Sequence, residues 1–330
     1  MAKRIVFPAK EQVELEEFAS EPIRPGALRL KTEVSLLSTG TEGICFGHLF
    51  EPGTHWEDWV KHPFYPGYST VARVVEVGGG VAGWQLGQLA VARTPHASEA
   101  VVDAAKVSPV PEGIESETAA WFALALIGFM GAKNGCYRLG DSIAFVGAGP
   151  VGQVALRWGV ACGARHVVAV DTVPGRLAMA KQGGATATVC APIAEAIPAV
   201  IEACGGKRPR VVVDVTGHAP VFEACLALPR DRGTMVVLGD TGTPSRQRLT
   251  RDVIRRGLVI VGAHGSHEEG DWTQAAIDDL FFSLLLRGKY DVGGLITHTF
   301  RPEACREAYA LVASGREASM GILFDWRQGA

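Results

Sequence analysis

One stretch of the sequence, DSIAFVGAGPVGQVALRWGVACGARHVVAVD (residues 141–171), restricts the possible folds more than any other. An apolar run is followed by three glycines in G-x-G-x-x-G spacing, and a helix-length segment then leads to a second apolar run. That second run ends in Asp171, 19 residues after Gly152. A strand, a glycine turn, a helix and a strand in this order predict a βαβ unit with a parallel sheet.

The glycines and the acid together predict a dinucleotide site. Gly147 permits a tight turn, Gly149 lets the backbone approach a pyrophosphate at the positive end of the helix dipole, and Gly152 lets the helix pack on the strand. Asp171 is expected to accept hydrogen bonds from ribose hydroxyls. The predicted contacts at the turn and the helix start are Gly147, Gly149, Pro150, Val151 and Gly152.

Asp171 also bears on the choice of cofactor. A carboxylate at this position repels a 2′-phosphate and favours NAD(H). The next three residues include no cation, and Arg176, the nearest one, leaves NADP(H) as the alternative.

Two later strand ends are expected at the same edge of the sheet, where a dinucleotide lies. They fall at residues 214–217 and 238–240. Ordinary turn chemistry at a strand end is the alternative role for the residues there. The predicted contacts are Thr216, Gly217, Leu238 and Gly239.

The pattern of apolar runs along the chain predicts two domains, as expected for 330 residues. Up to about residue 110, short β-branched runs alternate with Gly and Pro, whereas from about residue 140 apolar runs alternate with helix-length segments. The tail returns to strand, helix, strand and is expected to complete the first domain. We therefore predict an α/β protein with a β-rich domain, residues 1–118 and 292–330, and a doubly wound parallel sheet, residues 119–291, whose last helix lies in residues 270–289.

Composition and charge limit the class of partner. The net charge is −3 and no block of Lys and Arg is present, so neither nucleic acid nor an anionic membrane is expected to bind. The first residues, MAKRIVFPAK, lack the apolar core of a signal peptide, and the apolar stretch 119–130 is too short to span a bilayer. A cytoplasmic protein with a buried helix there is expected. The seven cysteines include no C-x-x-C pair, which predicts buried, reduced thiols.

Several blocks, in order, resemble the medium-chain dehydrogenase/reductase superfamily, which includes the zinc alcohol dehydrogenases. LLSTGTEG resembles the family's C-G-T-D stretch, and YPGYSTVARVVEVGGGVAGWQLGQLAV resembles P-G-H-E-x-x-G-x-V-x-x-V-G followed by G-D-x-V. Further blocks are SEAVVDAAKVSPVPEGIESETAA, GDSIAFVGAGPVG, VVVDVTG and GLITHTFRPEACREAYALV. The resemblance implies a GroES-like catalytic domain, a Rossmann domain, and a homodimer formed through the edge strand near LVIVGAH.

The family's zinc ligands do not carry over. Ser38 or Thr39 stands where the family has cysteine, and Tyr68 followed by Ser69 replaces His-Glu. The third ligand would fall in residues 121–124, which read Trp-Phe-Ala-Leu, and the structural zinc lobe is missing after QLAVAR. Because zinc needs three S, N or O ligands from the protein, no metal is predicted.

Without a metal, positioned hydroxyls and a general base are expected to handle the proton that accompanies hydride transfer. Tyr68 is predicted to hydrogen-bond the substrate oxygen, with Thr39 or Ser38 sharing it. Thr41 matches the family's relay hydroxyl, which passes a proton toward the cofactor ribose.

Three other candidates have structural alternatives. Glu42 replaces a family Asp and is either an acid or base, or a structural residue. His48 is either a proton shuttle or a packed histidine, and His96 has the same two roles open.

The segment 45–68 holds seven aromatic residues and borders the substrate cleft in the family fold. Aromatic walls suit a ring-shaped ligand, and local packing of a long loop is the alternative. These residues are Phe46, Phe50, Trp56, Trp59, Phe64, Tyr65 and Tyr68.

Three functions remain open from the sequence. STGTE without zinc ligands resembles the branch with bacteriochlorophyllide hydroxyethyl dehydrogenases and sugar or polyol dehydrogenase-like proteins. This implies an NAD(H)-dependent, zinc-independent dehydrogenase acting on a secondary hydroxyl of a sugar, polyol or other cyclic small molecule. The alternatives are a zinc-free quinone or enoyl reductase, which usually takes NADPH, and a non-catalytic NAD(H)-binding sensor or crystallin-like protein.

Overall fold

A computed structural model describes residues 1–266, 270–315 and 317–327, and its chain divides into two compact units. Unit 1 comprises Met1–Ala123, Gly270–Gly288 and Gly293–Ala330, and unit 2 comprises Leu124–Glu269 and Lys289–Val292. This division differs from the predicted boundaries in three places, because residues 119–123 and 270–288 group with unit 1 and residue 292 groups with unit 2.

Unit 2 contains a six-stranded parallel sheet in the order β10-β9-β8-β11-β12-β13. The strands are β8 (Ser142–Val146), β9 (His166–Asp171), β10 (Ala187–Cys190), β11 (Val211–Asp214), β12 (Thr234–Val237) and β13 (Val259–Gly262). The helices are α4 (Phe122–Asn134), α5 (Pro150–Ala161), α6 (Pro174–Gln182), α7 (Ile193–Ala203), α8 (Ala219–Cys225), α9 (Arg251–Arg256) and the 3₁₀ turn η2 (Pro244–Arg246). The order reverses between β8 and β11, which makes this a doubly wound Rossmann sheet and confirms that part of the predicted fold.

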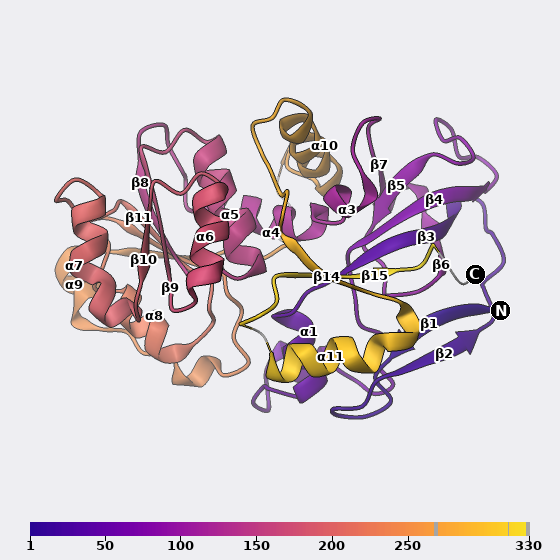
Figure 1. Ribbon diagram of the computed structural model, residues 1–330, viewed down its shortest axis with the longest axis horizontal. Coiled ribbons are helices and arrows are strands. Elements are labelled where there is room, and N and C mark those ends of the chain that lie inside the picture. The colour runs from indigo at the N-terminus through magenta and orange to yellow at the C-terminus, as the bar shows by residue number, and fades with distance from the viewer. Residues whose placement is uncertain (267–269, 316, 328–330) are drawn as a thin grey trace. The chain divides into compact units, whose positions relative to one another are not determined.

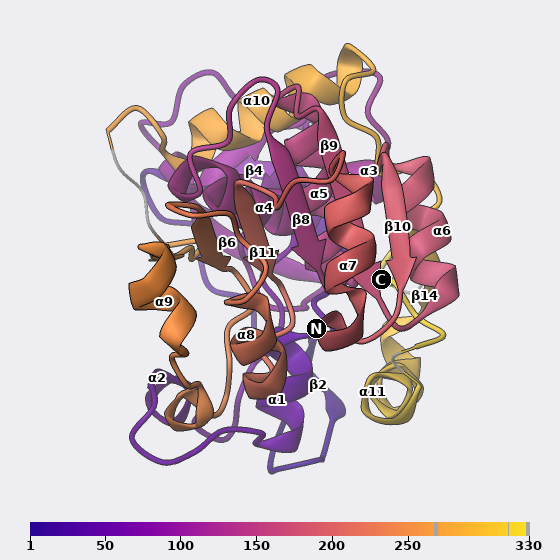
Figure 2. The same cartoon turned by 90° about the vertical axis from the view of Figure 1, so that its left-hand side faces the viewer.

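Helices cover both faces of this sheet (Figures 1 and 2). On one face, α7 and α8 pack through Val200 and Phe222 against the Val side chains of β8, β9 and β11. On the other, α5 approaches so closely that a Cβ at Gly159 would lie 3.1 Å from the ring of Phe145. Because both faces are buried, the central strands are continuous Val and Ile runs, which made them recognisable in the sequence.

One strand of this sheet was missed by the sequence reading. β10 is the edge strand, and its four residues, ATVC, alternate between half-buried and exposed. A short edge strand lacks the continuous apolar pattern of a strand covered on both faces.

Unit 1 is built on a seven-stranded sheet in the order β14-β15-β3-β4-β5-β7, with β6 also paired to β3. The strands from the tail of the chain do join the N-terminal strands in this sheet, since β15 pairs antiparallel with β3. The strands are β3 (Ala27–Leu37), β4 (Thr70–Val77), β5 (Leu89–Ala92), β6 (Glu99–Asp103), β7 (Val107–Pro109), β14 (Ile296–Phe300) and β15 (Gly321–Asp325), and a separate pair is β1 (Ala2–Val6) with β2 (Glu14–Phe18).

The helices of unit 1 are short or come from the tail. They are α1 (Thr41–Gly47), α2 (His55–Trp59), α3 (Ser116–Ala119), α10 (Gln274–Leu286), α11 (Cys305–Ser314) and the 3₁₀ turns η1 (Ala104–Lys106) and η3 (Pro302–Ala304). The helix predicted in residues 270–289 is α10, but its assignment to the Rossmann half differs from the structure. Its fully buried Asp278 accepts a 2.7 Å hydrogen bond from Ser108 in β7, and this bond ties α10 to unit 1.

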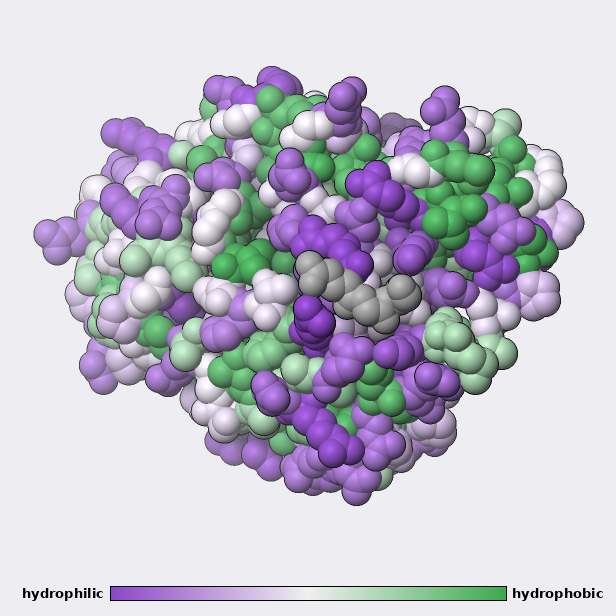
Figure 3. Space-filling view, turned by 45° about the vertical axis from the view of Figure 1, so that its right-hand side comes forward, coloured by the Kyte–Doolittle hydropathy of each residue, from purple (hydrophilic) through white to green (hydrophobic). Residues whose placement is uncertain are grey.

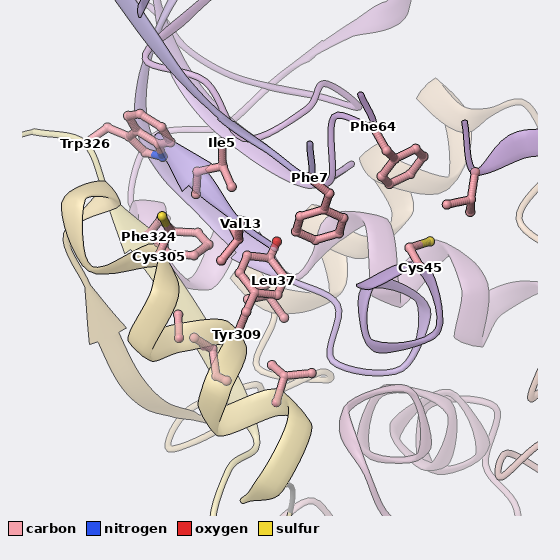
Figure 4. Close-up of a cluster of buried hydrophobic side chains, with 14 of the residues drawn as sticks. Ile5, Phe7, Val13, Leu37, Cys45, Phe64, Cys305, Tyr309, Phe324 and Trp326 are labelled. Carbon is pink, nitrogen blue, oxygen red and sulfur yellow. The ribbon is translucent and has the colours of Figure 1, made fainter. Parts of the chain in front are cut away.

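An aromatic cluster forms much of the core of unit 1 (Figure 4). Phe7 meets Tyr309 of α11 edge to face, with ring centroids 4.9 Å apart, and stacks with Phe64 at 5.9 Å. Trp56 and Phe64 are buried, whereas Trp59 is 49% exposed. Most of the aromatic segment 45–68 is therefore local packing, and its role as the wall of a ring-binding cleft is not supported for these buried residues.

Other expectations concern membrane-spanning segments and thiols. The described helices include none with the length and apolar character needed to cross a membrane, and hydrophilic and hydrophobic residues are interspersed on the face in Figure 3. The prediction of buried thiols is wrong for Cys136 and Cys190, which are exposed. Cys136 follows helix α4 with a positive φ of 48°, and Cys190 ends the edge strand β10, so neither lies under another layer.

Candidate functional site

The glycine turn after β8 has the geometry that a dinucleotide requires. Gly147 has φ +96°, and a Cβ there would lie 2.9 Å from Thr216 Cγ2. A Cβ at Gly152 would lie 2.0 Å from the Gly147 carbonyl oxygen, so only glycine allows α5 to start this close to the turn. At Gly149, the N-cap of α5, the space for a Cβ is empty. The turn is thus tight on the protein side and open where a ligand would approach.

The start of α5 offers unpaired donors at the same place. Pro150 has no N–H, and the N–H groups of Val151 and Gly152 in the first turn have no acceptor within the helix. No side chain caps this end at Gly149. Free N–H groups and the positive end of the helix dipole fit a pyrophosphate.

Asp171 lies at the end of β9 and braces the turn. Its Oδ2 accepts from the Ala148 N–H at 2.7 Å and its Oδ1 accepts from the Val173 N–H at 2.9 Å. Arg176 Nη1 is 3.9 Å from Oδ2. Each carboxylate oxygen retains a further lone pair for a ribose hydroxyl, so the residue present fits an adenosine ribose.

The predicted cofactor residues after β11 and β12 include one that contacts the glycine turn and two glycines at close backbone approaches. Thr216 donates from both its N–H and its hydroxyl to Asp214, at 2.8 and 2.7 Å, and it contacts the glycine turn. A Cβ at Gly217 would lie 2.6 Å from the Asp240 carbonyl, and one at Gly239 would lie 2.5 Å from the Val215 backbone. These glycines allow the backbones that follow β11 and β12 to pass close to each other. This close approach accounts for both glycines without a ligand.

The Leu238 side chain does not point toward the open side of the turn. It is 5% exposed and packs against α4, where a Cβ at Gly131 would lie 3.2 Å from Leu238 Cδ2. Only its backbone remains available to a cofactor.

In unit 1, three of the predicted catalytic hydroxyls lie together. The Tyr68 hydroxyl donates to Ser38 Oγ at 2.6 Å, and Thr41 Oγ1 lies 3.5 Å from Tyr68 Oη. Since Tyr68 donates to Ser38, Thr41 is the donor in the second contact. Thr39 is buried in the same turn, and the Arg93 guanidinium lies 5.4 Å from the centre of the Tyr68 ring. Burial raises the pKa of the Tyr68 phenol, so it is a neutral donor near pH 7.

Glu42 lies behind these hydroxyls as a buried acceptor. One carboxylate oxygen accepts from the Ser38 N–H at 2.8 Å. The other accepts from the Tyr309 hydroxyl and from His96 Nε2 at 3.1 Å. Glu42 is 1% exposed. Three donors on a carboxylate out of reach of solvent make Glu42 a structural anchor for Ser38, which favours the second of its two predicted roles.

His96 continues the same network away from the hydroxyls. It is fully buried, and its Nδ1 lies 2.8 Å from Ser35 Oγ, which also accepts from Trp326 Nε1 at 3.0 Å. The imidazole of His96 thus links Glu42, to which Nε2 donates, with the Ser35 hydroxyl at Nδ1. A Cβ at Gly67 would lie 2.7 Å from the His96 backbone nitrogen, so the turn before Tyr68 packs directly on this histidine. The packed role predicted as an alternative for His96 fits these contacts.

His48 takes part in a different contact. It is the left-handed C-cap of α1, and its Nε2 bonds His62 Nε2 while the two rings stack with centroids 4.6 Å apart. His62 Nδ1 lies 3.0 Å from the Phe7 carbonyl and donates to it, so its Nε2 accepts from His48. Burial, the charge of His62 and the charge of Lys10 lower the pKa of His48, in that order. The structure thus groups His48 with His62, as a packed histidine.

This histidine pair predicts a loss of stability in mild acid. The pKa of His48 is lower in the folded protein than in the unfolded chain, so the unfolded chain binds more protons below about pH 6.5. The melting temperature is therefore expected to fall as pH decreases from 7.5 to 5.5, and less steeply in His48→Asn, since Asn tolerates the left-handed φ of 47°. Differential scanning fluorimetry across this range checks it, with His298→Asn as a control, because His298 bonds only its neighbour Thr297 in the described contacts. Equal slopes in wild type and His48→Asn would contradict the assignment.

Comparison with known proteins gives three results. Residues 150–281 match a family model described as zinc-binding dehydrogenase. L-threonine 3-dehydrogenase of Bacillus subtilis (strain 168) is 30% identical over 177 residues, which are 54% of this chain and 49% of that protein. The match thus spans about half the length of this curated relative. These matches agree with the resemblance to the medium-chain dehydrogenase/reductase superfamily that the sequence motifs carry.

Solved structures agree on the fold over nearly the whole chain. An oxidoreductase/dehydrogenase of unknown specificity from Escherichia coli has a TM-score of 0.86 at 16% identity and covers 98% of this chain and 99% of its own. An alcohol dehydrogenase from E. coli CFT073, solved with NADH, has a TM-score of 0.82 at 19% identity with the same coverage. At these identities the likeness shows the fold alone.

The residues at the superfamily's zinc-ligand positions do not fit zinc. Ser38 and Tyr68 bond each other, and the buried Ser69 hydroxyl donates to the Ala120 carbonyl at 2.6 Å. The described part of the chain contains no group of three or more His, Cys, Asp or Glu side chains placed to hold a metal. Neutral hydroxyls engaged with each other are poor substitutes for thiolate and imidazole.

Sequence reasoning missed part of the polar network around Glu42. Ser35, Tyr309 and Trp326 were not singled out, although all three join the chain of bonds that ends at Glu42. They come from β3, α11 and the end of β15, and no local motif links such distant positions. Of this network, the sequence pointed only to Ser38, Glu42 and His96, and it gave no partners for them.

Proposed function

We propose that this chain is a zinc-independent oxidoreductase that transfers a hydride between NAD(H) and a secondary alcohol or ketone of a sugar, polyol or other ring compound. Unit 2 binds the dinucleotide and unit 1 supplies the proton-handling hydroxyls. When bound, the nicotinamide supplies the hydride chemistry.

The observation that carries the proposal is the hydrogen bond of 2.6 Å from Tyr68 to Ser38 at the positions where relatives with zinc have ligands. Zinc would stabilise the oxygen of the reacting alcohol. In its place, a neutral phenol can rotate from Ser38 to a substrate oxygen and donate its proton to a carbonyl that is being reduced. Ser38 and Thr41, whose hydroxyls lie 2.6 and 3.5 Å from the Tyr68 oxygen, are donors able to replace that proton.

The cofactor preference rests on Asp171. Its carboxylate is fixed by two backbone N–H groups at the end of β9, which supports NAD(H), since a 2′-phosphate there would meet a negative charge. Arg176, the cation that left NADP(H) open, lies 3.9 Å from the same carboxylate.

Turnover measured on a panel of substrates tests the proposal. We expect NAD⁺ reduction with cyclic polyols or sugars, weaker use of NADP⁺, less than one zinc per chain by elemental analysis, and unchanged rates after chelation. Stoichiometric zinc with chelator-sensitive activity would overturn the site assignment. Activity restricted to NADPH and enoyl or quinone substrates would establish the alternative reductase, and dinucleotide binding without any turnover would favour a sensor.

The glycine turn gives a direct test of the dinucleotide site. Gly149→Ala is expected to weaken NADH binding by about tenfold or more, ~1.4 kcal/mol, because the methyl group occupies the space that a pyrophosphate needs. The space is empty in the protein itself, so the melting temperature should not change. Fluorescence titration with NADH measures the effect. Gly79→Ala, another glycine with open space around it, is the control, and equal affinities in both variants would place the cofactor elsewhere.

The oligomeric state is also part of the proposal. β13 lies at the outer edge of the parallel sheet, and Val259 on it is 51% exposed while Ile254 on α9 is 91% exposed. Pairing of two such edges across a two-fold axis would cover both side chains, which supports a homodimer. Light scattering after size-exclusion chromatography is expected to give twice the chain mass, and Val259→Lys is expected to shift it toward the monomer.

A further inference from the structure

Far more basic than acidic side chains line one cavity in unit 2. It has a volume of about 980 Å³ and lies where β8, β9 and β11 begin, with Ser142, His166 and Arg210 on its wall. The dinucleotide turn follows the opposite, carboxyl end of β8. Seven Lys or Arg residues line the cavity against two acids, Asp141 and Asp231, in a chain whose net charge is −3.

Two of these basic side chains, Arg210 and Arg256, are held in place by ion pairs with carboxylates. Arg210 donates from Nε to Asp141 Oδ1 at 2.6 Å and from Nη2 to the other oxygen of the same carboxylate. Arg256 pairs with Asp252 at 2.8 Å, one turn earlier on α9. These pairs keep both guanidinium groups in place without a ligand.

Arg208 is held differently, because within the described residues it makes no ion pair. It donates to the Ala227 and Leu228 carbonyls, which are neutral acceptors. Burial, followed by the charge of Arg256, lowers the pKa of Arg208, and the charges of Asp252 and Asp231 offset this only in part. Arg208 and Arg256 therefore repel each other in this cavity. An anion between them would relieve that repulsion.

The other four cations lie on the rim. Arg165, Lys207, Arg230 and Arg255 are exposed, and within the described residues none of them makes an ion pair. They come from four separate segments, so they surround the hollow instead of forming one stripe along the surface.

We propose that this cavity binds a compact anion bearing several linked phosphate groups. A single monovalent anion could neutralise only one or two of the cations, whereas linked phosphates reach several walls at once, and guanidinium groups match phosphate oxygens in pairs. The described lining includes no Phe, Tyr or Trp on which a nucleobase could stack. The chemistry recognised is therefore the phosphate chain and not a base. The inference is independent of the proposed oxidoreductase function.

Isothermal titration of the full chain with sodium tripolyphosphate tests this site. We expect one molecule to bind per chain, more tightly than pyrophosphate, and sulfate to bind least tightly. Arg230→Glu and Arg255→Glu, both exposed, are each expected to weaken binding by about tenfold or more. Arg251 lies on α9, the helix of Arg255, but outside the cavity. Arg251→Glu makes the same change in net charge and is expected to weaken binding less than about threefold.

Several results would overturn the site. Unchanged affinity in both cavity variants, or an equal loss in Arg251→Glu, would mean that no specific cavity is involved. Loss of tripolyphosphate binding in Gly149→Ala would assign the anion to the dinucleotide turn. Tighter binding of a short DNA duplex would replace the small anion by a nucleic acid surface. If one variant fails to fold, as judged by circular dichroism, Lys207→Glu on another segment takes its place, since Lys207 is also exposed.

Discussion

Replacing Tyr68 by phenylalanine is expected to lower kcat by roughly 10²–10⁴-fold, the effect typical of a positioned acid or base. The phenol donates to Ser38 at 2.6 Å and is the only described side chain that bonds both Ser38 and Thr41. Phenylalanine keeps the ring beside Arg93 and removes only the hydroxyl. Stability and NADH affinity should therefore stay the same, and the loss should appear in kcat measured at saturating cofactor and substrate.

Tyr65→Phe is the matched control. Its hydroxyl accepts from Arg4 at 3.0 Å, away from Ser38, so its kcat should remain within about threefold of wild type. Because burial raises the pKa of Tyr68, ketone reduction by the wild type should show no loss of rate from this group below about pH 10. A Tyr68→Phe variant with wild-type kcat would make Tyr68 a packed aromatic, which the sequence left open.

The fold was readable from the sequence where elements are buried on both faces. The Val and Ile runs of β8, β9, β11, β12 and β13 and the G-x-G-x-x-G turn each carry a local signal, and the structure places all of them as predicted. The edge strand β10 carries a weaker signal because it is covered less. The helix α10 has an ordinary helix pattern, but nothing in that pattern tells which sheet its face will bury; the buried Ser108–Asp278 bond decides it.

The residues of the candidate site also divide into those that a local motif identified and those that it could not. The hydroxyls of Ser38, Thr41 and Tyr68 were identified because a family motif fixes their spacing, and the structure brings them together. The partners of Glu42 could not be identified, since they lie more than 50 residues away in His96 and more than 260 away in Tyr309.

The basic cavity illustrates the same limit on sequence reading. The sequence contains no Lys/Arg block, which argued against nucleic acid or an anionic membrane as a partner. Folding nevertheless brings cations from residues 165, 207–210, 230 and 255–256 to one hollow. Charge density on a surface depends on where strands begin, and a linear count does not contain that information.

Glu42→Ala is expected to have the largest effect on stability. The carboxylate accepts from Ser38, Tyr309 and His96, and its removal leaves three buried donors unpaired. Breaking such a buried network costs about 3–5 kcal/mol. For a domain of this size the melting temperature should fall by roughly 6–20 °C. Thermal and urea unfolding measure the loss, and Glu303→Ala is the control, because its ion pair with Lys3 is exposed and worth less than about 1 kcal/mol.

A double-mutant cycle separates the network from a simple loss of packing. Tyr309→Phe alone removes one donor from Glu42 and leaves the ring in the aromatic cluster. In the Glu42→Ala, Tyr309→Phe double variant, one of the unpaired donors is gone, so the total loss should be smaller than the sum of the two single losses. Glu42 also fixes the Ser38 backbone, so Glu42→Ala should lower kcat through Ser38 and Tyr68 even where the protein remains folded. Strict additivity of the two losses, together with an unchanged kcat, would mean that Glu42 neither shares a network with Tyr309 nor positions the hydroxyls.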